Sequence, residues 1–325
     1  MRAAVHHAFG NPAEELKAEE VEAPKPGPGE VLIKTTLSAI HNHDLITVEG
    51  NYGYKPALPA IGGSEAVGVI EQLGEGVSGV SVGQRVAVVG VHGTWAEYFV
   101  AKAKAVAPLP DAISDEAGAQ LLGMPLSAYF LLDFVGVQSG DWVIQNAANG
   151  AVAKVLAMIA RTRGINVINL VRRSSAIAEL EELGITNVLA TDDDGWQDAV
   201  KTMTGDSRIK AAVDGVAGPD AAVLMSLLGE NGVFVSFGAM SGKPLSLSAS
   251  DLIFKQALVK GFWLGKMMET MPQEEKFKGV STMMKLVASG DVKLQVGGIF
   301  DLDDMSKAAA ASRESGRPGK VLVRP

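Results

Sequence analysis

The chain has 325 residues, of which 47% are hydrophobic, and a formal net charge of −8. This length is typical of two domains, and an acidic chain without a basic block is a poor ligand for nucleic acid, because phosphate backbones attract clustered cations. The absence of cysteine excludes disulfides, thiol nucleophiles and thiolate–zinc sites. The N-terminal segment has no secretory apolar run, and no apolar run approaches the ~20 residues of a membrane span. We therefore expect a cytoplasmic protein.

Short β-rich runs separated by Gly- and Pro-rich turns fill residues 1–117. The predicted strands are 31–40, 66–74, 83–90 and 95–101. Many short strands with this punctuation predict a compact, β-barrel-like domain.

Strand-like and helical runs alternate in residues 118–262. Strands are predicted at 142–147, 166–171, 187–191, 211–216 and 232–238, and helices at 151–164 and 174–184, with further helical runs starting at Trp196 and Pro219. This alternation predicts a parallel, doubly wound sheet.

The last part of the chain, 263–325, contains an amphipathic helix at 274–290 and ends in the strand-like GKVLVRP. The simplest topology returns this tail to the first domain. The sequence therefore predicts an α/β protein with one domain of residues 1–117 and 263–325 and a second domain of residues 118–262.

The turn after the strand at 142–147 resembles a dinucleotide fingerprint. The run Ala148-Asn149-Gly150-Ala151-Val152-Ala153 has the spacing G-x-G-x-x-G/A, with Ala at the first and third Gly positions. Such a turn lets the backbone approach a pyrophosphate and opens a helix whose free N–H groups face the phosphates. We expect Asn149, Gly150, Ala151 and Val152 to bind a dinucleotide, the alternative being an ordinary strand-to-helix turn.

Two arginines follow the second strand of this domain. In an NAD-binding unit an acidic residue would meet the ribose hydroxyls here, whereas this strand runs into Arg172, Arg173, Ser174 and Ser175. Guanidinium groups attract a 2′-phosphate and hydroxyls can donate to it. The sequence therefore predicts NADPH as the cofactor, with a solvated basic helix start as the alternative.

The whole chain resembles the medium-chain dehydrogenase/reductase superfamily. The resemblance rests on PGPGEVLIK (26–34), Ala39–Leu45, GGSEAVGVI (62–70), GQRVAV (83–88) and GKVLV (319–323). Within the superfamily, the chain looks like the mitochondrial-type 2-enoyl thioester reductases and the quinone oxidoreductases. This likeness is carried by EGNYGYKPALPAIGGSE (49–65), GTWAEYFV (93–100), GDWVIQNAANGAVAKV (140–155) and GFWL (261–264). It implies a GroES-like β-barrel catalytic domain, a Rossmann NADPH-binding domain and a homodimer.

The resemblance also implies roles for single residues. Tyr52 matches the active-site tyrosine of the thioester reductases, and GFWL matches a segment that lines the nicotinamide and acyl pockets. Further cofactor contacts implied in this way are Phe237, Gly238, Phe262, Leu264 and Lys320. The implied substrate-pocket residues are Asn42, Trp95, Met124 and Trp263. Of these, Trp95 and Met124 are equally compatible with the core.

The chain departs from the family in its loop His41-Asn42-His43-Asp44, where zinc-free members often carry Asn-Pro-x-Asp. The positions that match zinc ligands hold His41 and Ser64, and serine is a poor zinc ligand. We therefore expect no metal. A metal site built from His41, His43, Asp44, Glu65 and His92 is the alternative.

Without a metal, charge that develops on a substrate oxygen must be met by a hydroxyl or backbone donor. This suits reduction of an activated C=C bond or a quinone. The main hypothesis is NADPH-dependent reduction of a 2-enoyl thioester, with hydride added to the β-carbon and Tyr52 as the donor to the enolate. The alternatives are a quinone or alkenal reductase and, from another class, a catalytically silent NADPH-binding protein like the lens-crystallin relatives of this fold.

Overall fold

The computed structural model describes residues 1–325, which form two compact units. The first contains residues 1–123, 283–288 and 294–325, and the second contains residues 124–282 and 289–293. These limits differ from the predicted ones, because residues 118–123 belong to the first unit and residues 263–282 and 289–293 to the second. The second difference has a packing cause: Gly279 lies against the Phe130 ring, within the second unit. No helix is long and apolar enough to cross a membrane.

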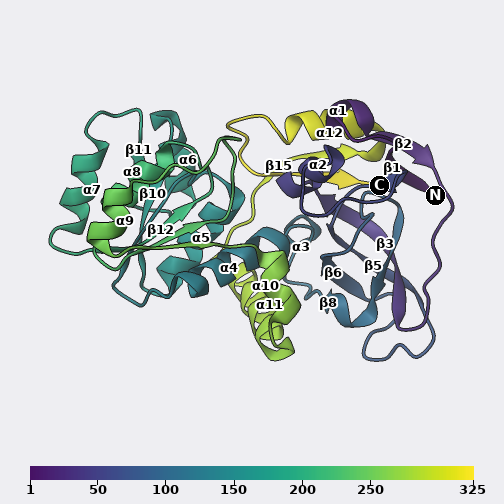
Figure 1. The fold of residues 1–325 in the computed structure, drawn as a ribbon. Coiled ribbons are helices and arrows are strands. Elements are labelled where there is room, and N and C mark those ends of the chain that lie inside the picture. Colours follow the sequence, from purple (N-terminus) through teal and green to yellow (C-terminus); the bar gives the residue numbers. More distant parts are fainter. The chain divides into compact units, whose positions relative to one another are not determined.

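The first unit is built mainly from β-strands (Figure 1). Its strands are β1 (Arg2–His6), β2 (Lys17–Glu20), β3 (Glu30–Ala39), β4 (Ala60–Ile61), β5 (Glu65–Leu73), β6 (Arg85–Val89), β7 (Tyr98–Lys102), β8 (Val106–Pro108), β15 (Val296–Asp301) and β16 (Lys320–Arg324). Its helices are α1 (Pro12–Glu15), α2 (Asn42–Val48), α3 (Asp115–Gly118) and α12 (Met305–Ala311), with short 3-10 turns η1 (Ala103–Ala105) and η3 (Leu302–Asp304).

A seven-stranded sheet organises this unit. Its order is β15-β16-β3-β5-β6-β8, with β7 also paired to β3, and a smaller sheet has the order β2-β1-β4. The long strand β3 is rich in β-branched and apolar residues, most of them buried, which suits a strand inside a sheet. Its pairing with β16 confirms that the C-terminal strand joins the first domain.

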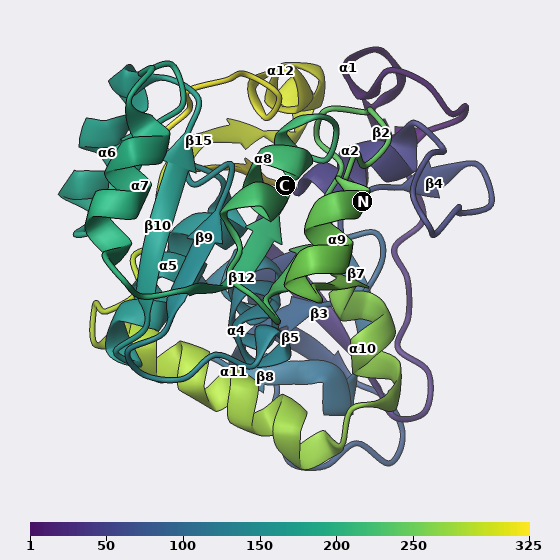
Figure 2. The ribbon, with the colours of Figure 1, turned by 60° about the vertical axis from the view of Figure 1, so that its left-hand side comes forward.

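The second unit holds a six-stranded parallel sheet, several of whose strands are seen side by side in Figure 2. Its strands are β9 (Trp142–Gln145), β10 (Asn166–Val171), β11 (Val188–Ala190), β12 (Ile209–Asp214), β13 (Val233–Ser236) and β14 (Leu258–Gly261). Its helices are α4 (Gly123–Val135), α5 (Ala151–Thr162), η2 (Ser174–Ala176), α6 (Ile177–Glu182), α7 (Trp196–Thr204), α8 (Asp220–Leu227), α9 (Ala249–Lys255), α10 (Leu264–Thr270) and α11 (Gln273–Ala288), whose last six residues, 283–288, cluster with the first unit.

The order β11-β10-β9-β12-β13-β14 confirms the doubly wound sheet. The central strands are near-continuous apolar runs because helices cover the sheet: α5 packs on β10 and α8 on β12. The chain leaves β9 toward β10 and later returns on its other side as β12, so β9 marks the switch point of the topology. In such sheets ligands bind beyond the carboxyl ends of the strands at this point. The predicted dinucleotide turn follows β9 directly.

Candidate functional site

A buried histidine–carboxylate pair forms the centre of the first unit's polar site. Glu65 is the first residue of β5, and its Oε2 lies 2.6 Å from Nε2 of His41, with both side chains fully buried. Its Oε1 accepts the backbone N–H groups of Leu122, at 2.6 Å, and Gly123, at 2.9 Å. A side chain at Gly123 would collide with this carboxyl, so glycine is required there. The pair therefore fixes the start of α4 to the start of β5.

Burial controls the proton in this pair. It raises the pKa of Glu65 to about 8, against the smaller opposite effect of the two N–H donors. Burial also lowers the pKa of His41 well below its usual value, with a further contribution from Lys320. Both directions favour a protonated Glu65 that donates to a neutral imidazole. The other ring nitrogen of His41, Nδ1, is buried without a partner.

The raised pKa of Glu65 predicts a pH-dependent stability. A carboxyl whose folded pKa lies above its unfolded value binds more protons when folded, so its contribution to stability falls as pH rises from about 4.5 to about 8. Urea unfolding should therefore show wild type losing at least about 2 kcal/mol relative to Glu65→Gln between pH 5 and 9, since each pKa unit is worth about 1.4 kcal/mol. Glu71→Gln, an exposed position on the same strand, is the matched control and should track wild type. Parallel curves for Glu65→Gln and wild type would contradict the assigned proton.

A second histidine links the buried pair to the predicted catalytic tyrosine. The His43 ring stacks on His41, with centroids 5.1 Å apart, and on Tyr52, with centroids 5.5 Å apart. Its Nε2 lies 2.8 Å from Ser64 Oγ and 3.4 Å from Asp44 Oδ1. The structure thus brings Tyr52 beside a histidine that is itself held by two polar groups.

Two other residues of the first unit, Tyr54 and Asn42, are exposed. Tyr54 lies elsewhere, stacked on His92 with centroids 4.0 Å apart, and is 40% exposed. Asn42 is exposed at the first position of α2. No group of three or more His, Asp or Glu side chains is arranged to hold a metal ion.

Trp95 lies in the core of the first unit, which agrees with the core alternative that the sequence left open. It is fully buried, and its indole N–H donates to the carbonyl of Ala39 at 3.0 Å. A side chain at Gly62 or Gly63 would collide with the indole ring. The two glycines therefore let the backbone close over Trp95.

Lys320 lies in the first unit, at the start of β16. Its ammonium is buried, 3.4 Å from the carbonyl of Ile40, and burial lowers its pKa to about 8. Asp44 and Glu65 oppose this shift, so the ammonium belongs electrostatically to the histidine–carboxylate site. Its role as a cofactor contact stays a prediction.

The predicted nucleotide turn of the second unit is anchored from the next strand. Asn146, which follows β9, donates to Asp214 Oδ1 at 2.6 Å and accepts the N–H of Gly215 at 2.8 Å. Gly150 then caps α5 without a side chain, which leaves the first N–H groups of the helix free to meet an anion. Asn149 is exposed, and Ala151 and Val152 are partly buried in that first turn. The sequence analysis missed Asn146 and Asp214, although a polar residue at the end of each central strand was a usable signal.

The remaining cofactor candidates of this unit lie beyond the same strand ends. Phe237 and Gly238 follow β13, and a side chain at Gly238 would lie 2.8 Å from the carbonyl of Gly215. Phe262 follows β14 and is buried against Phe134, with ring centroids 5.5 Å apart.

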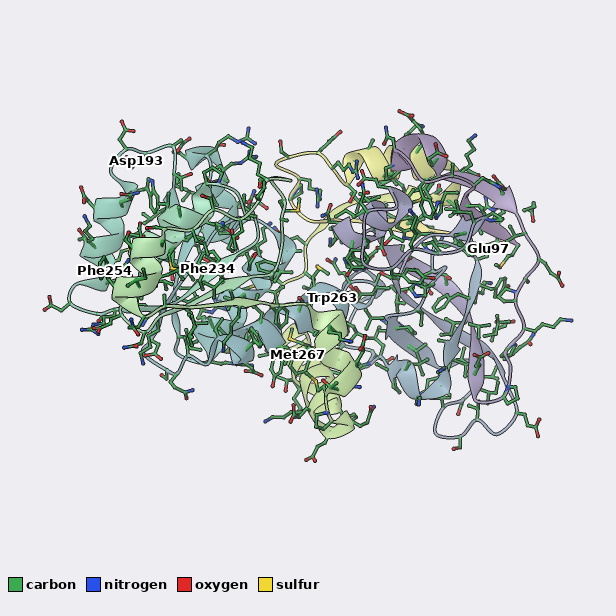
Figure 3. All side chains as sticks on the ribbon, in the orientation of Figure 1. Glu97, Asp193, Phe234, Phe254, Trp263 and Met267 are labelled. Atoms are coloured by element: carbon green, nitrogen blue, oxygen red, sulfur yellow. The ribbon has the colours of Figure 1, made fainter.

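Three more predicted residues lie in helical or adjoining segments of this unit. Trp263, labelled in Figure 3, is 50% exposed and precedes Leu264, the first residue of α10. Met124, predicted in the substrate pocket, is partly buried near the start of α4.

Asp192, which the sequence did not single out, interacts with Arg173 of the arginine pair. Arg172 and Arg173 are exposed after β10. Asp192, which follows β11, accepts the hydroxyl of Ser174 at 2.7 Å and its N–H at 3.2 Å. These bonds, together with Arg173, hold the pKa of Asp192 below its usual range. A carboxylate therefore occupies donors that a phosphate would use.

Comparison with known proteins agrees with this architecture. Residues 27–111 match the alcohol dehydrogenase GroES-like domain, and residues 151–284 match the zinc-binding dehydrogenase family. The mitochondrial enoyl-[acyl-carrier-protein] reductase of Caenorhabditis elegans is 33% identical over 319 residues, which cover 94% of this chain and 90% of that protein. The chain belongs to the medium-chain dehydrogenase/reductase superfamily. It is an oxidoreductase with the superfamily's GroES-like and Rossmann-like domains, as predicted.

Solved structures of this superfamily give the same result. A Bacillus thuringiensis protein assigned as an NADPH:quinone reductase is 27% identical, with a TM-score of 0.92 over 100% of this chain and 98% of its own. A mycobacterial protein solved with NADPH is 28% identical, with a TM-score of 0.88 over 100% of both chains.

Proposed function

We propose that this medium-chain oxidoreductase reduces the C=C bond of a 2-enoyl thioester with NADPH. The observation that carries the proposal is Tyr52 beside the His43–Ser64 contact, in a chain without cysteine. Such a site offers hydroxyl and imidazole donors to a substrate oxygen. The enoyl-[acyl-carrier-protein] reductases among its relatives support this substrate class.

The cofactor proposal rests on charge. Arg172 and Arg173 are two exposed cations at the strand end where the adenosine ribose of a dinucleotide is held in this fold. Their guanidinium groups suit a 2′-phosphate, and the α5 N-terminus with Gly150 suits the pyrophosphate. The mycobacterial relative solved with NADPH supports the same choice.

In the proposed reaction, NADPH supplies a hydride to the β-carbon of the enoyl group. Negative charge then develops on the thioester oxygen. The hydroxyl of Tyr52 donates to that oxygen, and the stacked His43 ring holds the tyrosine ring in place. A preorganised donor costs no reorganisation at the moment of reaction, which is why a neutral hydroxyl suffices for an enolate.

The choice of acceptor is tested by following NADPH oxidation with crotonyl-CoA and with a simple quinone at equal concentrations. We expect kcat/KM to be at least roughly 10-fold higher for crotonyl-CoA, because only the enolate gains the full benefit of a positioned donor. The reverse order would favour the quinone or alkenal reductase, which the solved NADPH:quinone reductase supports as second candidate. NADPH binding without oxidation by either acceptor would favour the catalytically silent alternative.

We also propose a cytoplasmic homodimer without bound zinc, on the resemblance and on the lack of thiolate ligands.

A further inference from the structure

His43 and Ser64 form a contact that the family resemblance does not explain, because His43 lies in the segment that departs from the Asn-Pro-x-Asp pattern. His43 Nε2 lies 2.8 Å from Ser64 Oγ, and the pair adjoins Tyr52. We infer that His43 and Ser64 are the proton source of this enzyme, which delivers the α-proton while Tyr52 stabilises the enolate oxygen. The inference rests on the proposed enoyl reduction and adds two catalytic residues to it.

The surroundings of His43 suit a group that gains and loses a proton. Its side chain is 28% exposed, so water can reload it, and imidazole is the side chain that changes charge between pH 5 and 8. The carboxylate of Asp44 lies 3.4 Å from Nε2. Ser64 directly precedes β5 and is partly buried, and its hydroxyl is within hydrogen-bond distance of His43.

His41 and His43 have different surroundings and therefore different roles. His41 is fully buried, and its Nε2 is bonded to Glu65, so it exchanges no proton with substrate. Its ring stacks on His43 at an interplanar angle of 13°, which makes it a positioning residue. The buried Lys320 supplies positive charge near Asp44, and burial lowers the pKa of His92. Of the two stacked histidines, His43 is the accessible one.

The proposed reduction takes up one proton from water for each substrate molecule. The hydride pair forms the new C–H bond at the β-carbon, and the π pair of the C=C bond moves into the enolate. The α-carbon then takes the proton of the Ser64 hydroxyl while charged His43 returns a proton to that oxygen. His43 is left neutral and recovers its proton from solvent, so each NADPH oxidised consumes one solvent proton.

The test compares wild type, Ser64→Ala, His43→Gln and the double variant with crotonyl-CoA and NADPH. Each single variant should lower kcat roughly 10- to 100-fold, and the double variant should be no slower, because the two residues act in one step. Wild-type kcat should fall toward alkaline pH, because the proposed step starts from a charged imidazole, and this fall should vanish in the variants. His7→Gln is the matched control, since His7 is exposed and pairs with Glu19.

The stereochemistry of the product would stay unchanged in the variants if His43 and Ser64 had only a structural role. In D2O, wild type should place deuterium at one of the two prochiral α-positions, whereas the variants should place it at both, because solvent then protonates the enolate. Variants with the wild-type rate, pH profile and stereochemistry would overturn the inference and leave the proposed function intact. If His43→Gln fails to fold, Ser64→Ala, which removes one oxygen atom, carries the test. A wild-type enzyme unable to oxidise NADPH with crotonyl-CoA would overturn the proposed function, and the inference with it.

Discussion

Replacing Tyr52 with phenylalanine is expected to lower kcat for crotonyl-CoA by roughly 10- to 1000-fold, because one preorganised hydroxyl donor is worth about 1.5–4 kcal/mol at a transition state. The ring that stacks on His43 is retained, so folding and NADPH affinity should stay unchanged. Steady-state kinetics with both acceptors measures the effect. Quinone reduction should suffer less, since hydroquinone oxygens take protons from water after hydride transfer.

Tyr54→Phe is the matched control for this variant. Tyr54 is two residues away and stacks on His92 instead of His43, so its hydroxyl should not affect kcat. An inactive Tyr54→Phe beside a fully active Tyr52→Phe would move the donor to Tyr54 and keep the mechanism. Full activity in both would remove the tyrosine mechanism.

Replacing both Arg172 and Arg173 with alanine should erase a preference for NADPH over NADH of at least roughly 30-fold. Two charge-assisted contacts of about 1–1.5 kcal/mol each after solvent screening give this order. NADH affinity should stay nearly unchanged, because NADH has no 2′-phosphate. Fluorescence titration of both cofactors at one fixed ionic strength measures the two Kd values.

Asp192→Asn tests the same site by removing a negative charge. The carboxylate of Asp192 accepts the N–H and the hydroxyl of Ser174, so its neutralisation should tighten NADPH binding and leave NADH binding unchanged. Persistent NADPH selectivity in the double arginine variant would place the phosphate site elsewhere in the chain.

Much of the fold could be predicted from local patterns. Strand β10 is apolar apart from Asn166 and Asn169, and its predicted limits, 166–171, are those of the structure. Element ends were less accurate, because they depend on tertiary contacts. The strand predicted from Trp95 begins only at Tyr98, since the indole of Trp95 turns into the core to reach Ala39. The helix predicted from Ser174 begins as a 3-10 turn.

The site was less predictable than the fold, because its decisive contacts join distant residues. Glu65 binds N–H groups 57 and 58 positions later in the chain, and a backbone donor has no sequence signature. Asp192 lies 18 positions after Ser174 and is one of three consecutive aspartates, so sequence alone did not distinguish it. Tyr52 was found only through a family likeness, and its stacking on His43 depends on the fold of α2.

The pairing of β16 with β3 has a consequence for how the chain is made. Residues 124–282 are contiguous, so the nucleotide-binding sheet can form while the ribosome is still at work, since domains fold as units during synthesis. The seven-stranded sheet cannot: β3 emerges early and must wait for residues 320–324 to close its edge. Until then its apolar surface is open to chaperones and proteases. The first part of the enzyme to be translated is therefore the last to be finished.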